Sequence, residues 1–270
     1  MLNFTPEKTK NQNVIIVMPA DKLFLLGGYD LEMLTIKQLL EGREGCVVVD
    51  KQLRWDNALL SAYQEELQSY ADADIYGIEL REDITTPGNY HRIDHHNDWN
   101  DRPSALEQIA DVLGVILNRD QQLVAANDKG YIPAMIAIHA TNEEIADIRR
   151  RDRSAQGVTV EEELLAEQSV TDNLSRYGSL LVVKSLTSRF SPICDRLFPY
   201  QQLIIYTDDA EWMFYGDGKA ELVSVFAEDI KKKKVFHGGG ENGYIGAVNN
   251  AFTQREITQI IEIIKQKYEI

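Results

Sequence analysis

Short apolar runs alternate with segments of helical periodicity along the first half of the chain, and this pattern constrains the fold most strongly. The run from Lys22 to Gly28, "KLFLLGG", is followed by residues 29–42, where leucines fall on one helical face. Further strands are predicted at 46–50, 75–80 and 90–96, and helices at 55–71 and 104–118. Strands separated by helices predict an α/β domain with a mainly parallel sheet covered on both faces.

The second half of the chain predicts another, smaller α/β domain. We expect a first domain over residues 1–150, a charged helical connector over 151–175 and a second domain over 176–270. Within the second domain, "GDGK" (216–219) lies between two β-rich runs and predicts a hairpin turn. An amphipathic helix is predicted at the end of the sequence, and Arg149 to Arg151 are expected to be solvated residues of the connector.

Charge and cysteine content narrow the class of protein. The chain has 28 basic and 43 acidic residues and a net charge of -15, so neither duplex DNA nor an anionic membrane is an expected partner. A small anionic substrate remains compatible, because local groups and bound cations decide what one cleft holds. Cys46 and Cys194 have neither a zinc spacing nor a disulfide framework, and no run resembles a signal peptide or a membrane span. These features predict a cytoplasmic protein.

The stretch His91 to Trp99, "HRIDHHNDW", contains three of the five histidines in the chain. It could be only a polar strand and loop. However, Asp30, Glu79 and His95 each follow an apolar strand run, and the carboxyl ends of parallel strands meet at one edge of a sheet. Imidazole and carboxylate side chains that meet at this edge could share a metal ion.

The segment "DHHND" after a strand, followed by a helix that begins at a serine, resembles the signature of the DHH phosphoesterases. That family includes oligoribonucleases, RecJ-type exonucleases, cyclic dinucleotide phosphodiesterases and family II pyrophosphatases. The resemblance implies two divalent metals, usually Mn²⁺, and attack of metal-bound hydroxide on a phosphate ester. For this chain we expect one or two Mn²⁺ ions, with Mg²⁺ as a substitute.

Matched position by position, the resemblance implies two sets of site residues. His96 and Asp94 would be catalytic, with His96 polarising the phosphate or protonating the leaving group. The metal ligands would be Asp30, Glu32, Glu79, His95 and Asp128. The histidine that the family has in its first motif is missing, because Leu25, Leu26, Gly27 and Gly28 cover its place.

The segment "HGGGENGYIGA" resembles the glycine motif of the second-domain type called DHHA1. It implies a substrate-binding loop made of His237, Gly238, Gly239, Gly240 and Asn242. Glycines let backbone N–H groups approach an anion closely. Here Glu241 stands where the family has a histidine, and four lysines, 231–234, precede the loop.

Structural roles compete with several of these assignments. Asp30 and Glu32 could serve only the N-terminus of a helix, and Asp128 could be a helix N-cap. The sequence therefore predicts a metal-dependent phosphodiesterase or phosphomonoesterase acting on nucleotides or short oligonucleotides. The alternative is a catalytically inactive nucleotide-binding or interaction module with the same fold, and either form is compatible with a homodimer.

Overall fold

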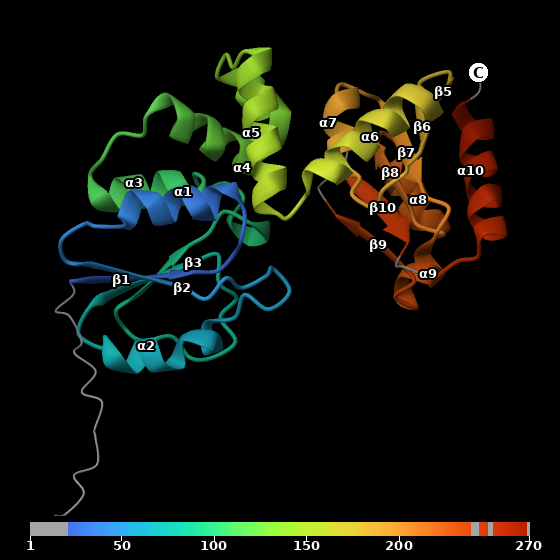
Figure 1. The fold of residues 1–270 in the computed structure, drawn as a ribbon. Coiled ribbons are helices and arrows are strands. Elements are labelled where there is room, and N and C mark those ends of the chain that lie inside the picture. Colours follow the sequence, from blue (N-terminus) through green and yellow to red (C-terminus); the bar gives the residue numbers. More distant parts are fainter. Residues whose placement is uncertain (1–20, 239–242, 248–250, 269–270) are drawn as a thin grey trace, which may run out of the picture. The chain divides into compact units, whose positions relative to one another are not determined.

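A computed structural model describes residues 21–238, 243–247 and 251–268, and the chain divides into two units, Met1–Thr141 and Asn142–Ile270 (Figure 1). Each unit is built on one sheet with helices packed against it. The predicted α/β class is confirmed. Residues 151–175, expected to form a connector, lie within the second unit.

The first unit contains a four-stranded parallel sheet. In the order β2-β1-β3-β4, its strands are Cys46–Asp50, Lys22–Leu26, Asp74–Ile78 and Tyr90–Ile93. The register places Leu26 level with Ile78, and Ile78 level with Ile93. Because the strands run in one direction, the residues that follow them meet at one edge of the sheet.

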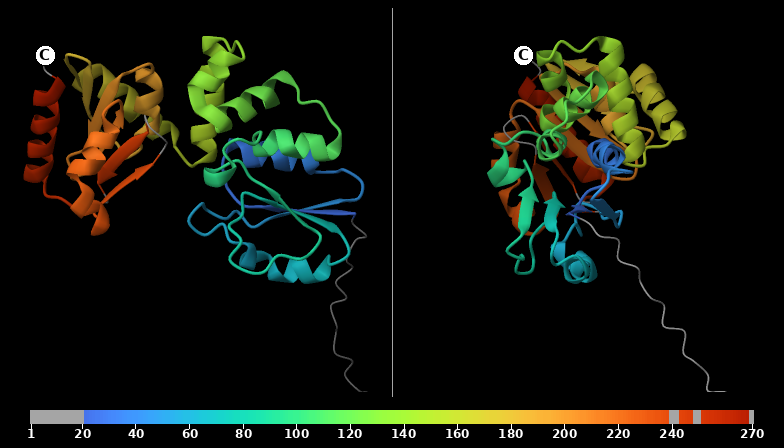
Figure 2. Two further views of the ribbon diagram at one scale, coloured as in Figure 1. Left: turned by 180° about the vertical axis from the view of Figure 1, so that it is seen from behind. Right: turned by 90° about the vertical axis from the view of Figure 1, so that its left-hand side faces the viewer.

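Helices cover both faces of this sheet (Figures 1 and 2). One face carries α1 (Leu31–Leu40), α3 (Ala105–Leu113) and α4 (Arg119–Ala137), and the other carries the short η1 (Leu60–Tyr63) and α2 (Gln64–Ser69). A second 3-10 turn, η2 (Asn97–Trp99), follows β4. Alternating strand side chains face the two layers, as in Leu23 and Leu25, which join the core beneath α2.

The helix predicted over 55–71 is only partly present, since regular helix begins at Leu60. Residues 51–59 form a loop that is tied to the chain after β3. The Arg81 N–H donates to Ala58 O at 2.9 Å, and the Leu60 N–H donates to Arg81 O at 3.0 Å. Backbone groups engaged in these long-range bonds are not available for a continuous helix.

The second unit contains a six-stranded mixed sheet in the order β5-β6-β7-β8-β10-β9. These strands span, in that order, Leu174–Tyr177, Leu180–Lys184, Gln202–Tyr206, Trp212–Gly216, Tyr244–Ala247 and Val235–Gly238. Only β6 and β7 pair in parallel. The helices are α5 (Asn142–Ala155), α6 (Val160–Asn173), α7 (Ser191–Leu197), α8 (Lys219–Val225), α9 (Ala227–Lys231) and α10 (Gln254–Tyr268).

The hairpin predicted at 216–219 is wrong. The antiparallel strands β7 and β8 are joined by residues 207–211 instead, where the Thr207 N–H donates to Glu211 O at 3.0 Å. Gly216 and Gly218 have φ angles of 97° and 93°, so the strand ends there and α8 begins at Lys219. The run after "GDGK" is helical because Leu222 is buried on one face of α8 against the sheet.

Buried ion pairs hold α5 against α6 and α7. Arg153 Nε lies 2.6 Å from Glu163 Oε1 of α6, and its Nη1 contacts Asp195 of α7. Arg149, expected to be solvated, is only 8% exposed and also pairs with Asp195. That expectation is wrong, because the periodicity of α5 turns Arg149 and Arg153 inward together, at i and i+4.

Arg153→Ala is expected to lower the free energy of unfolding of the second unit by about 1.5–3 kcal/mol, because two buried or partly buried carboxylates each lose one of their two arginine partners. Urea denaturation, followed through the buried Trp212, measures the change. The matched control is Arg150→Ala on the same helix, where the pair with Asp147 is exposed (62% and 48% of the side chains) and worth less than about 1 kcal/mol. Equal losses in the two variants would contradict the buried network.

The helices and the cysteines can be compared with the expectations from composition. Among the helices within the described ranges, none is long and apolar enough to cross a membrane. Cys46 and Cys194 are both free thiols, in agreement with their spacing.

Candidate metal centre

One imidazole nitrogen and three carboxylates converge at the edge where the parallel strands of the first unit end. His95, two residues after β4, is 5% exposed. Its Nε2 lies 2.7 Å from Asp128 Oδ2, 3.2 Å from Glu79 Oε1 and 3.7 Å from Glu32 Oε2. These carboxylates come from α4, the residue after β3 and the first turn of α1, so segments far apart in the sequence meet here.

The atoms that face one another in this cluster are buried and make no hydrogen bond of acceptable geometry. They are Glu32 Oε2, both carboxylate oxygens of Glu79, His95 Nε2 and Asp128 Oδ2. Buried polar atoms are nearly always hydrogen-bonded, and buried charges are paired or bind metals. Five such atoms on four neighbouring side chains fit a cation held between these side chains.

Electrostatic effects on the same groups agree with this arrangement. Burial raises the pKa of Glu79 well above its usual range, and it raises the pKa of Asp128 to about 6, with a further contribution from the charge of Glu32. Burial alone would lower the pKa of His95, but the carboxylates of Asp128, Glu32 and Glu79 raise it to about 12. Without a cation, the protonated ring of His95 therefore compensates only part of the negative charge.

Glu79 is held in an unusual backbone conformation. Its φ angle is 52°, in the left-handed region that non-glycine residues seldom adopt, and its side chain is buried. Strain of this kind concentrates at functional sites. The Glu79 N–H donates to Ile93 O at 2.8 Å, which ties the end of β3 to the end of β4, two residues before His95.

Gly27, directly after β1, lies against the backbone that carries Glu79. A Cβ atom at this position would lie 2.3 Å from Ile78 O and 2.4 Å from Glu79 O. No side chain fits there without moving that backbone. Gly27 therefore permits the close approach of β1 and β3 that sets the position of Glu79.

Gly27→Ala is expected to lower the free energy of unfolding by about 1–3 kcal/mol and to weaken ion binding, because the backbone at Glu79 must shift. Urea denaturation and a Mn²⁺ titration measure the two effects. Gly88→Ala is the matched control, since a Cβ atom at Gly88 would have nothing within 4 Å. Unchanged ion affinity in Gly27→Ala would contradict the role of this contact.

Asp30 and Glu32 have different places at the start of α1. Asp30 is the N-cap, and its Oδ1 accepts a hydrogen bond from the Met33 N–H at 2.9 Å. Glu32 accepts a hydrogen bond from the Leu106 N–H through Oε1 at 2.9 Å and turns Oε2 toward His95. Of this predicted acidic pair, the structure brings Glu32 beside His95, whereas Asp30 caps the helix.

His96 and Asp94 form a second layer beside His95. The ring of His96 lies 4.3 Å from that of His95, and its side chain is 42% exposed. Its Nδ1 lies 3.4 Å from Asp94 Oδ1 and 3.7 Å from Glu79 Oε1. Burial acts to raise the pKa of Asp94, but hydrogen bonds from the side chain and backbone of His96 lower it overall. Asp94 is therefore a charged partner that orients His96.

Asp128 lies inside α4, which bears on the alternative that it caps a helix. A break in helical geometry follows at Gly130 and Tyr131, with Tyr131 at a φ angle of 59°, and Pro133 lies just beyond. The N-cap of α4 is Asn118, ten residues earlier in the chain. Asp128 thus faces His95 from within the helix.

The donor set can be tested against the ions that the sequence suggests. One ligand atom each from Glu79, His95, His96 and Asp128 lies within 4.8 Å of the others, and Glu32 adds a carboxylate oxygen next to His95. Oxygen-rich sites with imidazole suit Mn²⁺, and carboxylate oxygens suit Mg²⁺. The residues fit such an ion.

Of the predicted substrate loop, two residues can be described. His237 is exposed on β9, and Gly238 pairs with Tyr244 of β10. Gly239, Gly240 and Asn242, together with Glu241, lie outside the described residues. The buried Lys219, which the sequence analysis did not single out, donates from Nζ to Gly238 O at 3.0 Å.

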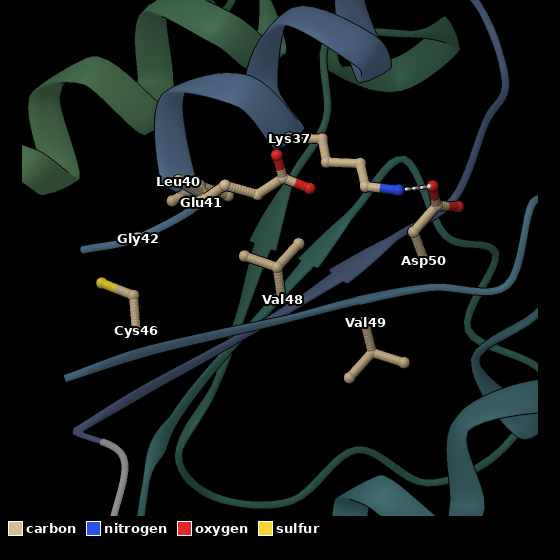
Figure 3. A pocket seen from close by; sticks show the side chains of 8 residues that line it. All are labelled: Lys37, Leu40, Glu41, Gly42, Cys46, Val48, Val49 and Asp50. Carbon is tan, nitrogen blue, oxygen red and sulfur yellow. Dashed lines mark hydrogen bonds and ion pairs between the residues drawn. The ribbon is translucent and has the colours of Figure 1, made fainter. Parts of the chain in front are cut away.

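A pocket of about 460 Å³ lies between the end of α1 and the edge strand β2 (Figure 3). Lys37 and Asp50 form an ion pair of 2.9 Å at this pocket. None of the side chains around His95 lines it. The pocket and the acidic cluster are therefore separate features of the first unit.

Comparisons with known proteins give distant structural likenesses. No family model and no curated protein matches the chain. A pGpG-specific phosphodiesterase, PggH from Vibrio cholerae, is 11% identical with a TM-score of 0.45, covering 92% of this chain and 98% of that one. A protein from Helicobacter pylori G27 is 11% identical with a TM-score of 0.25, covering 91% and 99%.

A third solved structure, the DHH domain of a member of the s1p family of ribosomal proteins, is 12% identical with a TM-score of 0.39. The similarity covers 88% of this chain and 73% of that one. All three TM-scores lie below 0.5.

Proposed function

We propose that the chain is a metal-dependent phosphohydrolase of the DHH type, acting on a phosphodiester or phosphomonoester of a nucleotide or short oligonucleotide. The observation that carries this proposal is the set of five buried side-chain atoms, His95 Nε2 and four carboxylate oxygens, that make no hydrogen bond of acceptable geometry. One imidazole that faces three buried carboxylates is poorly explained as a structural ion-pair network, because the excess negative charge is costly to bury without a cation.

The ligands we assign are Glu32, Glu79, His95 and Asp128, and they would hold one Mn²⁺ or Mg²⁺ ion. A bound divalent cation neutralises phosphate charge and lowers the pKa of a water molecule. Because metal ligands must be unprotonated, His95 would release its proton in order to hold the ion. The hydrogen bond from the Leu106 N–H to Oε1 fixes the orientation of Glu32 and leaves Oε2 for the ion.

Several observations favour one ion over two. Asp30 uses Oδ1 to cap α1. The missing family histidine has no substitute, since Gly27 packs against backbone and Gly28 against the ring of Trp55. Within residues 21–238, 243–247 and 251–268, no second group of three or more His, Cys, Asp or Glu side chains could hold an ion.

His96 is assigned as the residue that donates a hydrogen bond to the phosphate or a proton to the leaving group. Its half-exposed ring adjoins the ligands, and Asp94 holds its Nδ1 side. This contact with Asp94 orients the imidazole toward the ligands, and a general acid must be positioned in this way for proton transfer. In the second unit, His237, Gly238, Gly239, Gly240 and Asn242 are assigned to substrate binding, with Lys219 fixing the carbonyl of Gly238.

Metal content and turnover together test the proposal. Protein purified without chelator should contain one ion per chain by elemental analysis, and it should hydrolyse dinucleotides or bis-p-nitrophenyl phosphate in Mn²⁺. Two ions per chain would contradict the single-ion centre only. Equal metal content in wild type and His95→Ala would contradict the whole assignment. Nucleotide binding without turnover would instead identify the inactive binding module.

A further inference from the structure

We propose that Trp55 is a stacking platform for the nucleobase of the phosphate ester bound at the metal centre, an inference that rests on the proposed function. Trp55 lies in the loop between β2 and η1 and is 50% exposed, more than any other aromatic side chain in the described part of the chain. Large exposed aromatic rings beside a polar site are typical of ligand-binding surfaces.

The indole of Trp55 is supported by two parts of the site. A Cβ atom on Gly28 would lie 2.9 Å from both Cη2 and Cζ2 of the ring, so the indole packs on bare backbone at that glycine. The ring centroid is 5.4 Å from that of His96, with an interplanar angle of 60°. The indole is thus fixed beside the residue assigned to the leaving group, and half of its surface is open to solvent.

The loop that carries Trp55 is held in a defined conformation. The Arg54 N–H donates to Asn57 Oδ1 at 2.8 Å, and the Asn57 N–H donates to Arg54 O at 2.9 Å. At its end the loop is bonded to Arg81, two residues after Glu79. A ring already ordered before binding loses little conformational entropy when a ligand stacks on it.

The negative charge around Trp55 favours a neutral nucleobase over an anionic group as the part of the ligand that stacks on the indole. The net charge of -15 and the carboxylates around His95 oppose an anion wherever a cation does not offset them. A nucleobase can stack its neutral π-face on the indole and so add binding energy without adding charge. Every base has such a face. We therefore expect purine nucleotides to bind more tightly than pyrimidine nucleotides, and sugar phosphates without a base to bind least.

Competition binding of AMP and ribose 5-phosphate to Mn²⁺-loaded full-length protein tests the platform, because the two probes share a phosphate and a ribose. Wild type should bind AMP about tenfold more tightly, as expected for one stacked base. Trp55→Ala should bind the two probes equally, with unchanged affinity for ribose 5-phosphate. Trp55→Phe should keep most of the preference for AMP.

Ile116→Ala, which truncates a side chain that is 95% exposed in the same unit, is the matched control and should behave as wild type. Metal content is measured for each variant. An AMP preference that survives in ion-loaded Trp55→Ala overturns the platform and leaves the proposed function standing. A wild type that takes up no ion refutes the proposed function, and the platform with it.

Discussion

His95→Ala is expected to lose the bound ion and all turnover above background. His95 is the group on which Glu32, Glu79 and Asp128 converge, and its buried Nε2 is the nitrogen ligand that we propose for the centre. Loss of an outer-shell partner already lowers metal affinity by about 10–100-fold, and loss of a direct ligand should exceed this. Isothermal titration with Mn²⁺ and elemental analysis measure the loss independently of activity.

His91→Ala is the control for this experiment. His91 lies on β4, four residues before His95, and its side chain is 49% exposed, 3.7 Å from Asp74. The His91→Ala variant should bind Mn²⁺ with the same affinity as wild type. The His95→Gln variant lacks the imidazole nitrogen but keeps an N–H donor near the carboxylates. It therefore distinguishes loss of the metal ligand from loss of folding. If folded His95→Ala and His95→Gln both retain wild-type affinity, the ion is held elsewhere.

Asp128→Asn is expected to have opposite effects on ion binding and on the stability of the metal-free protein. The ion loses a ligand, so its affinity falls. In protein stripped with chelator, however, ionised Asp128 is unfavourable, because burial and the charge of Glu32 raise its pKa from 3.8 to about 6. The neutral amide removes a penalty of up to about 3 kcal/mol, since one pKa unit corresponds to about 1.4 kcal/mol.

The pH dependence follows from the direction of this shift. The folded state holds the Asp128 proton up to about pH 6, whereas the unfolded state releases it near its ordinary pKa of 3.8. The contribution of Asp128 to stability therefore falls as the pH rises through this window, and the penalty is complete above it. Urea denaturation of metal-free wild type and Asp128→Asn between pH 4 and 8 should show this difference.

Asp111→Asn removes a charge from the exposed face of α3 and is the control for the change in net charge. Its stability should follow that of wild type at every pH. A metal-free Asp128→Asn that is less stable than wild type at pH 8 would show that Asp128 forms a favourable ion pair with His95. In that case the cluster would be a structural network rather than an ion site.

The strands of the first unit could be predicted from the sequence, because their positions follow from the local spacing of apolar residues. The apolar runs at 22–28, 46–50 and 75–80 coincide with β1, β2 and β3, because strand and helix periods depend on neighbouring residues. The predictions of secondary structure were wrong where contacts between residues far apart in the sequence determine the local conformation. The turn after Tyr206, and not "GDGK", joins β7 to β8, and bonds to Arg81 prevent helix at 51–59.

The sequence by itself determined that parallel strands would end at one edge and that His95 and Glu79 would follow two of them. Only the tertiary structure decided which carboxylates face His95. Asp30 and Glu32 are two residues apart, yet one caps α1 and the other turns inward, because a backbone N–H 74 positions away at Leu106 holds it. The place of Trp55 beside His96 was also not visible in the sequence, since it depends on a loop fastened to the end of β3. Side-chain direction at a strand end is set by such long-range contacts, which leave no periodic signal in the chain.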